Sequence, residues 1–319
     1  MRRIAITLMV AMVSVTMSGQ SKRWAVVGLS SIYMRVAPDY ESALETQELM
    51  GTVVEVTGEK GYWREIVSPQ PYKAWCTEKG IVEMSPEALK AYQQAPKCIF
   101  TRLYGHVYRQ PSCKSQSICD LVGGDIMRLA GDQKVVVTKS DKKVRFTRTK
   151  GWTKVILPDG TEGWVKSECI KPHTGFRSIA KGEGNAESIS KAQMEDIIET
   201  AFRLKGVPYL WGGMTPKGVD CSGLVRWSFL MNGILLPRNA SQMEHCGDHV
   251  SLDSLVRGDL VFFGTPASED KPQRVTHVGI YIGNGHIIHS SHLVRVNSII
   301  PGERDYYENA HKLIAARRL

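Results

Sequence analysis

The chain contains two neighbouring runs, Gly206-Val207-Pro208-Tyr209-Leu210-Trp211-Gly212-Gly213 and Val219-Asp220-Cys221-Ser222-Gly223-Leu224-Val225. Apolar residues recur at helical spacing after the cysteine, at Leu224, Val225, Phe229 and Leu230. A glycine-rich loop therefore delivers Cys221 to the first turn of a buried helix. Unpaired backbone N–H groups and the helix dipole there favour a thiolate, the form that attacks carbonyl carbons. The same N–H groups are suited to binding an oxyanion.

A cysteine nucleophile needs a base, and two histidines follow at a useful spacing. Residues 274–283 form an apolar, strand-like segment that contains His277, and Asn284-Gly285 predicts a tight hairpin turn before a second strand that contains His289. The two imidazoles are therefore expected on neighbouring antiparallel strands. If both face the same side, His289 hydrogen-bonds the far nitrogen of His277 and fixes its tautomer.

The first half of the chain contains an internal repeat. Its Pro-to-Gly interval of 13 residues and its Trp-to-Trp interval of 12 residues each occur twice. Short alternating runs separated by Gly, Pro and Asp turns predict that each unit is a small β-barrel. The second unit carries a basic insertion between Leu129 and Gly151. The matched residues are Pro38 and Gly51 with Pro111 and Gly124, and Trp63 and Trp75 with Trp152 and Trp164.

Composition and the amino terminus limit the function classes. Hydrophobic residues make up 42% and charged residues 23%, which is typical of a folded globular protein of two or three domains. The net charge of +9 suits an anionic partner such as cell wall, although a solvated basic surface is the alternative. Arg2 and Arg3 before an apolar run predict an export signal over residues 1–18. The odd count of seven cysteines leaves at least one unpaired within the chain.

Four segments together resemble the NlpC/P60 peptidases: Pro208–Gly223, Gly258–Phe263, His277–Tyr281 and Ile288-His289. The resemblance implies an α+β fold, with a papain-like catalytic domain over residues 190–319. Residues 24–84 and 100–172 resemble bacterial SH3 domains, which are small β-barrels. The family resemblance implies Cys221 as nucleophile, His277 as base, His289 as third member and Tyr209 as support for the oxyanion.

Two SH3-like units before the catalytic domain resemble the γ-D-glutamyl-L-diamino acid endopeptidases, also called dipeptidyl-peptidases VI. That resemblance implies substrate contacts in the catalytic domain, with Asp220 meeting a free amine, and weaker ones in the first SH3-like unit. Thr52 and the Pro69–Tyr72 segment depart from the usual pattern of that unit. The candidate substrate contacts are Trp211, Asp220, Ser222, Ser241, Glu48, Tyr72 and Trp75.

The resemblance thus predicts an exported enzyme of the periplasm or cell envelope. It is expected to cleave peptidoglycan stem peptides with a free N-terminal L-Ala, as a monomer without cofactor, metal, nucleic-acid partner or stable membrane insertion. Rival functions are an N-acetylmuramoyl-L-alanine amidase or acyltransferase of the same fold, and a non-catalytic wall-binding protein. For single residues, the alternatives are a structural thiol at Cys221, core histidines at His277 and His289, a helix cap at Asp220 and simple packing at Trp211. A zinc site is disfavoured because ligand pairs at the usual close spacing are missing.

Overall fold

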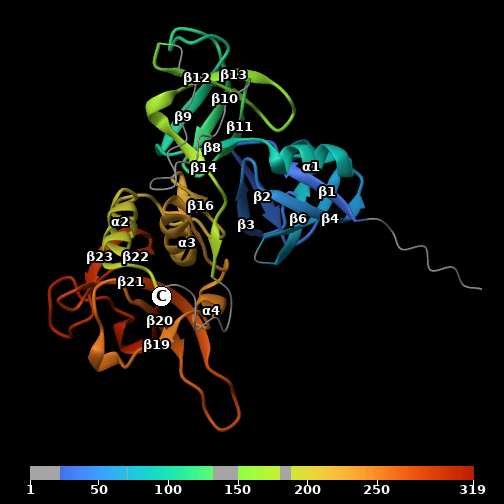
Figure 1. Cartoon of the computed structure of the whole chain (residues 1–319). Helices are drawn as coiled ribbons and strands as arrows, with labels where there is room; N and C mark the ends of the chain where they lie inside the picture. The colour runs from blue at the N-terminus through green and yellow to red at the C-terminus, as the bar shows by residue number, and fades with distance from the viewer. Residues whose placement is uncertain (1–21, 70, 132–149, 180–187) are drawn as a thin grey trace, which may run out of the picture.

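The computed structural model describes residues 22–69, 71–131, 150–179 and 188–319. Figure 1 shows two β-domains, coloured blue and green, beside a carboxy-terminal domain that contains helices and a sheet. We call residues 22–84 the first β-domain and residues 97–173 the second. The predicted export signal and most of the basic insertion lie outside the described residues. Within the described part, no helix is long and apolar enough to cross a membrane.

The two β-domains are built alike. The strand order is β3-β2-β6-β5-β4-β1-β7 in the first and β10-β9-β13-β12-β11-β8-β14 in the second, so each strand has its counterpart. This shared order agrees with the predicted repeat and is consistent with SH3-like domains. The strands of the first domain are β1 (Arg23–Val27), β2 (Ser31–Arg35), β3 (Leu44–Leu49), β4 (Val53–Lys60), β5 (Trp63–Ser68), β6 (Tyr72–Thr77) and β7 (Ile81–Met84). Those of the second are β8 (Lys97–Phe100), β9 (Tyr104–Tyr108), β10 (Ser117–Val122), β11 (Ile126–Leu129), β12 (Trp152–Ile156), β13 (Glu162–Lys166) and β14 (Ile170–His173).

The repeated glycines allow the two β-domains to pack closely against each other. Gly51 and Gly124 both have positive φ, 86° and 106°, in the turns that follow β3 and β10. A Cβ on Gly51 would collide with the backbone of Ile126, and one on Gly124 would press on the Leu49 side chain. Ile126 also donates its backbone N–H to the carbonyl of Met50 at 2.9 Å. Glycine therefore recurs in the repeat because the turn needs left-handed backbone and the neighbouring domain leaves no room for a side chain.

Short helical segments punctuate the chain. Helix α1 (Pro86–Gln94) joins the two β-domains, and Ser85 caps it by accepting from the N–H of Ala88. Single 3₁₀ turns η1 (Glu78–Gly80) and η2 (Ser167–Cys169) precede the last strand of each β-domain. Two more, η3 (Leu252–Ser254) and η4 (Ala310–Lys312), precede strands of the carboxy-terminal domain.

The carboxy-terminal domain packs helices against an antiparallel sheet. Its helices are α2 (Lys191–Phe202), α3 (Cys221–Met231) and the short α4 (Ala240–Met243). The six-stranded sheet has the order β19-β24-β20-β21-β22-β23. Its strands are β19 (Asp248–His249), β20 (Leu260–Thr265), β21 (Arg274–Gly283), β22 (His286–Ser291), β23 (Leu293–Ser298) and β24 (Leu313–Arg318). Two small ribbons pair β15 (Arg177–Ser178) with β18 (Ile234–Leu235), and β16 (Met214–Thr215) with β17 (Gly218–Val219).

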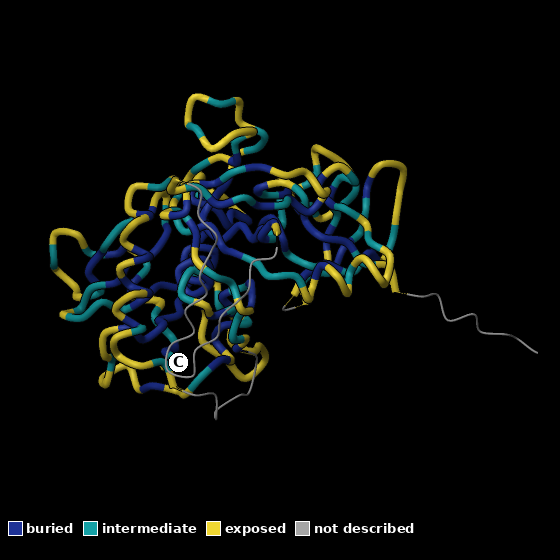
Figure 2. Tube along the Cα trace, turned by 45° about the horizontal axis from the view of Figure 1, so that its top comes forward, coloured by how far each residue is buried: buried dark blue, intermediate teal, exposed yellow. Residues whose placement is uncertain are grey.

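Helix α3 is buried on every side, from Cys221 to Leu230. One face packs with α2 and the sheet, and the others meet the β-domains. Trp227 donates its indole N–H to the carbonyl of Gly123 in the second β-domain at 2.8 Å. Leu230 shares an apolar cluster with Leu49 of the first β-domain and Val122 of the second. Figure 2 shows buried segments running through the middle of the molecule and exposed segments at its turns.

Candidate active site

Cys221 opens α3, and the local sequence explains how. Asp220 is the N-cap, and its Oδ1 accepts from the backbone N–H of Gly223 at 2.6 Å. A Cβ at position 223 would collide with the carbonyl of Gly213, so glycine lets the preceding loop lie against the first helical turn. The thiol is 7% exposed, at the start of the helix as the sequence predicted.

His277 and His289 face each other across neighbouring strands. His277 lies on β21 and His289 on β22, joined by a hairpin turn in which Asn284 and Gly285 both have positive φ. The Nε2 of His277 lies 2.8 Å from the Nδ1 of His289. Helix α3 packs on these strands, and the backbone of Val278, next to His277, interacts with the Cys221 thiol. The structure therefore brings the predicted thiol and both predicted imidazoles to one place.

A fourth polar residue, Asn297, extends this pair. Its Oδ1 lies 3.0 Å from the Nε2 of His289, and its Nδ2 donates to the backbone carbonyl of Asp305 at 2.7 Å. Asn297 lies on β23, two residues beyond the partner of His289, which is Arg295. Sequence reasoning missed Asn297 because only the pairing of β22 with β23 brings it beside His289.

Aromatic rings pack against the pair, in which His289 is fully buried and His277 is half-buried. The ring of Tyr307 lies 4.5 Å from that of His289 and 5.5 Å from that of His277, centroid to centroid. On the neighbouring strand β20, the ring of Phe263 lies 5.7 Å from that of His277, centroid to centroid. Burial lowers the pKa of His277 to about 3 and that of His289 to about 4, with the hydrogen bond to Asn297 partly opposing the second shift. Both imidazoles are therefore neutral near pH 7.

The pKa of the Cys221 thiol is raised, whereas the position at a helix start had suggested a lowered pKa. Burial, followed by the negative charge of Asp220, raises the pKa of Cys221 to about 11, while backbone contacts with Val278 and Ser222 lower it by less. The predicted resting thiolate is therefore not favoured, because the desolvation of the sulfur outweighs the helix terminus. The thiol and both imidazoles are therefore neutral at rest.

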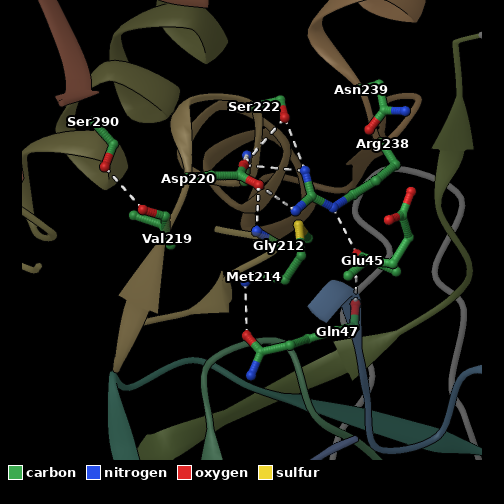
Figure 3. Close-up of polar contacts among 12 residues, drawn as sticks. Glu45, Gln47, Gly212, Met214, Val219, Asp220, Ser222, Arg238, Asn239 and Ser290 are labelled. Carbon is green, nitrogen blue, oxygen red and sulfur yellow. Dashed lines mark hydrogen bonds and ion pairs between the residues drawn. The ribbon is translucent and has the colours of Figure 1, made fainter. Parts of the chain in front are cut away.

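Asp220 is fully engaged with protein groups, as Figure 3 shows. Arg238 donates to both of its oxygens, at 3.1 Å and 2.6 Å, and to the hydroxyl of Ser222 at 2.8 Å. The Ser222 hydroxyl in turn lies 3.1 Å from Oδ1, and the N–H of Gly212 donates to Oδ2 at 3.0 Å. Arg238 and Asp220 are 2% and 7% exposed. The expectation that Asp220 meets a substrate amine stays a prediction, although Arg238 already compensates its charge and its oxygens accept hydrogen bonds from protein groups.

The first β-domain supplies residues to the same region through β3. Thr46 accepts from the Nε of Arg238 at 2.6 Å, and Gln47 accepts from the backbone N–H of Met214 at 2.8 Å. The backbone of Glu45 lies against Gly212, beside the exposed Trp211. Strand β3 is therefore part of the wall around the glycine-rich loop.

The acid of this wall is Glu45, and the predicted Glu48 lies elsewhere. Tyr72 donates its hydroxyl to Glu45 at 2.5 Å, and burial together with this contact raises the pKa of Tyr72 to about 12. Asn239 lies 3.5 Å from the same hydroxyl. Glu48 is buried against Arg226, 3.7 Å away in the middle of α3. Glu45 lies at a register shift in the pairing of β3 with β2, between Leu44 and Thr46, so the regular alternation of faces along β3 does not extend from Glu48 to Glu45.

Comparison with known proteins identifies this arrangement. The NlpC/P60 family description matches residues 206–313. The carboxy-terminal domain belongs to the NlpC/P60 family. The chain is 29% identical over 280 residues to a gamma-D-glutamyl-L-lysine dipeptidyl-peptidase of Bacillus subtilis, covering 87% of this chain and 82% of that protein. It is 26% identical to dipeptidyl-peptidase 6 of Lysinibacillus sphaericus, covering 82% and 86% of the two chains. The chain is accordingly a hydrolase of the cysteine-peptidase type.

The fold match extends beyond the NlpC/P60 domain. The crystal structure of an NlpC/P60 family protein from Bacillus cereus superposes with a TM-score of 0.70 at 22% identity, covering 92% of this chain and 99% of that one. At that identity the likeness concerns the fold. The shared architecture therefore includes the two β-domains as well as the carboxy-terminal domain.

The remaining predicted contacts lie around the mouth of the NlpC/P60 site or away from it. Tyr209 is half-buried, and burial followed by the Cys221 sulfur raises its pKa, which places the phenol near the thiol. Trp211 is 67% exposed on the loop before Gly212. Ser241 is exposed on α4, two residues after the N-cap Asn239. Trp75 is half-buried on β6, where it pairs with Glu65 on β5.

The cysteines and possible metal ligands complete the site description. All seven cysteines lie within the described residues, and none of them forms a disulfide; Cys76, Cys98 and Cys246 are buried like Cys221, whereas Cys113 is exposed. Among the described residues, the cluster that could hold a metal ion is His286, Glu303 and Asp305, on a surface turn.

Proposed function

We propose that this protein is an exported cell-wall peptidase that hydrolyses the γ-D-glutamyl bond to the diamino acid of peptidoglycan stem peptides. Relatives across most of the chain's length bear the names gamma-D-glutamyl-L-lysine dipeptidyl-peptidase and dipeptidyl-peptidase 6. The observation that carries the proposal is the buried Cys221 at the start of α3 beside the His277–His289 pair. The predicted amino-terminal signal supports action outside the cytoplasm.

In this proposal the reaction starts from a neutral Cys221 thiol and a neutral His277 imidazole. As the Cys221 sulfur attacks the γ-glutamyl carbonyl, its proton passes to the Nδ1 of His277, the ring nitrogen that His289 leaves free. The tetrahedral intermediate collapses, His277 returns the proton to the leaving amine of the diamino acid, and a thioester remains. A water molecule then gives its proton to His277 and attacks the thioester. The dipeptide leaves as a carboxylic acid, and the thiol is restored.

The oxyanion of each tetrahedral intermediate needs donors near the sulfur. The phenol of Tyr209 stays protonated because its pKa is raised, so it can donate a hydrogen bond. The backbone N–H groups at the start of α3 are the second source of donors. Desolvation of the sulfur also means that substrate binding has little water to displace at the reacting atoms.

Recognition of a free N-terminal amine is assigned to Glu45 in this proposal. It lies on the first β-domain beside Gly212, and its carboxylate accepts a hydrogen bond from the neutral hydroxyl of Tyr72. A carboxylate of this kind attracts an ammonium group, whereas an amidated L-Ala that is still attached to muramic acid carries no such charge. Asp220 does not serve this role, because Arg238 compensates its charge.

The test uses the full chain with defined peptides and mass spectrometry. L-Ala-γ-D-Glu-L-Lys is incubated with the wild-type protein and with Cys221→Ala, and the N-acetylated tripeptide and intact sacculi are digested in parallel. The proposal predicts L-Ala-D-Glu and free lysine from the first peptide, and little product from the acetylated peptide. Dipeptide release by Cys221→Ala would refute the assigned nucleophile. Release of whole peptides from sacculi would instead favour an N-acetylmuramoyl-L-alanine amidase.

A further inference from the structure

We propose that Asn297 is a positioning residue that sets the tautomers of His289 and His277, so that the bare ring nitrogen of His277 is the one facing Cys221. The inference deepens the proposed function and rests on the role given there to His277. It names a residue outside the three that the sequence suggested.

The amide of Asn297 can take one orientation. A backbone carbonyl accepts hydrogen bonds and has none to donate, so the atom of Asn297 that lies 2.7 Å from the carbonyl of Asp305 must be the NH₂ group. The other end of the amide, Oδ1, then faces the Nε2 of His289 at 3.0 Å. The Asp305 carbonyl is itself held in place, because it also accepts a hydrogen bond from the backbone N–H of Ser298 at 3.1 Å.

The orientation of the amide fixes both imidazoles in turn. An amide oxygen only accepts, so the Nε2 of His289 must carry a hydrogen. A neutral ring has one such hydrogen, which leaves the Nδ1 of His289 as an acceptor. The Nε2 of His277, 2.8 Å away, must then be the donor. His277 is neutral too, so its Nδ1 has a free lone pair. Two buried hydrogen bonds thus leave one nitrogen able to accept the thiol proton.

Solvent cannot replace Asn297 in this chain. His289 is 0% exposed, and Asn297 is 8% exposed. The rings of Tyr307 and His289 are in contact at 4.5 Å between centroids, which covers the pair on that side. If the acceptor is removed, the Nε2–H of His289 is left buried and unpaired, at a cost of about 1–3 kcal/mol. The opposite tautomer of both rings avoids that cost, and it places a hydrogen on the Nδ1 of His277.

The test replaces Asn297 by Leu and by Asp in the full chain. Histidine ring nitrogens are labelled with ¹⁵N, and their long-range ¹H–¹⁵N spectra at pH 7 report the tautomer of each ring. The wild-type protein should show both rings protonated at Nε2. Asn297→Leu should move both to Nδ1–H and reduce kcat on the free tripeptide by about 10²- to 10³-fold with little change in KM. Asn297→Asp keeps an acceptor, so it should retain the wild-type tautomers and most of kcat.

A charge beside His289 gives Asn297→Asp a second signature. The carboxylate favours the protonated imidazole, so the acidic limb of the kcat/KM profile should move to higher pH than in the wild-type protein. The control is Asn232→Leu, which removes a partly buried amide that donates to Ser228 at 2.9 Å, at the far end of α3. It should lower the melting temperature without changing the histidine tautomers.

Three results would overturn the inference. They are wild-type tautomers in Asn297→Leu, Nδ1–H tautomers in the wild-type protein, and equal loss of kcat in the Leu and Asp variants with an unshifted pH profile. The wild-type spectrum answers the question even if Asn297→Leu does not fold. Failure of the proposed function appears separately, as cleavage by Cys221→Ala or a different product, and it leaves the tautomer result unaffected.

Discussion

Arg238 donates its Nε–H to the hydroxyl of Thr46 at 2.6 Å, a hydrogen bond between residues 192 positions apart. Arg238 belongs to the NlpC/P60 domain, and Thr46 lies on β3 of the first β-domain. The same guanidinium holds Asp220, the cap of the helix that carries Cys221. Arg238 therefore links the docking of the first β-domain to the placement of the nucleophile.

Replacing Thr46 by Val should loosen this junction. The buried Nε–H of Arg238 loses its acceptor, so the free energy of unfolding should fall by about 1–3 kcal/mol, with a lower kcat/KM on the free tripeptide. Urea unfolding and peptide kinetics provide the two measurements. Thr153→Val is the matched control, because it removes a buried threonine hydroxyl bonded to Ser167 within the second β-domain. An unchanged kcat/KM in Thr46→Val would contradict the prediction and show that catalysis does not depend on this hydrogen bond.

Removing the guanidinium itself should be more costly. Arg238→Leu leaves the buried Asp220 carboxylate without its counter-charge, which is expected to cost about 3–5 kcal/mol of stability. Adding Asp220→Asn removes the stranded charge, so the double variant should be more stable than the sum of the two single changes predicts. A thermal and chemical unfolding cycle of the four proteins measures this coupling. Additive losses would mean that the pair contributes nothing beyond its separate groups.

Glu45 and Glu48 provide a matched test of amine recognition. Glu45→Gln should reduce kcat/KM on L-Ala-γ-D-Glu-L-Lys by about tenfold or more, since one charge pair is lost, and should narrow the gap between free and N-acetylated peptides. Glu48→Gln should preserve that gap, because Glu48 lies against Arg226 instead. Competition between the two peptides, followed by mass spectrometry, gives the ratio directly. The reverse pattern would return the role to Glu48.

The buried histidines make stability depend on pH in a defined window. Their pKa values are lowered from 6.5 to about 3 for His277 and about 4 for His289. The unfolded chain therefore binds more protons than the folded one below pH 6.5, so this stability is complete above pH 6.5 and lost as the pH falls towards 4 and 3. The two shifts together set an upper limit on this loss on the order of 8 kcal/mol. Unfolding curves of the wild-type protein and His289→Asn should diverge most above pH 5, with the shallower pH dependence in the variant.

Alkylation of Cys221 reports the state of its sulfur. With a pKa of about 11, the rate of reaction with iodoacetamide should rise about tenfold for each pH unit from 7 to 9, since the thiolate is the reactive form. Cys221→Ala corrects for the exposed Cys113. A rate that stays flat across this range would instead indicate a thiolate already present at neutral pH, as the position at the helix terminus first suggested.

Local patterns predicted much of the fold. Apolar spacing and the Asp220 cap located α3, and Asn284-Gly285 located the hairpin that brings His277 opposite His289. The repeat of Gly and Trp positions agrees with the matching strand orders of the two β-domains. Each of these features depends on neighbours within a turn or a strand pair, so it leaves a mark on the sequence itself.

The missed residues depend on strand pairing and on packing between segments, which no local pattern specifies. Asn297 reaches His289 from the neighbouring strand β23. Glu45 was passed over for Glu48 because the face of β3 that meets the loop cannot be read from the strand alone. Arg238 follows a proline in an unremarkable loop, although it is 2% exposed and meets two domains. The thiol pKa was misjudged for a related reason, because the depth of burial is set by packing rather than by helix position.

The all-round burial of α3 has a consequence for how this protein is made. The helix lies in a socket to which Gly123, Leu49 and Val122 of the earlier domains contribute. A fragment that begins at α2 would expose Trp227 and Leu230 to water and leave Arg226 without its counter-ion. We therefore expect the isolated catalytic fragment to aggregate. In the nascent chain, we expect the two β-domains to fold first and α3 with Cys221 to pack against them last.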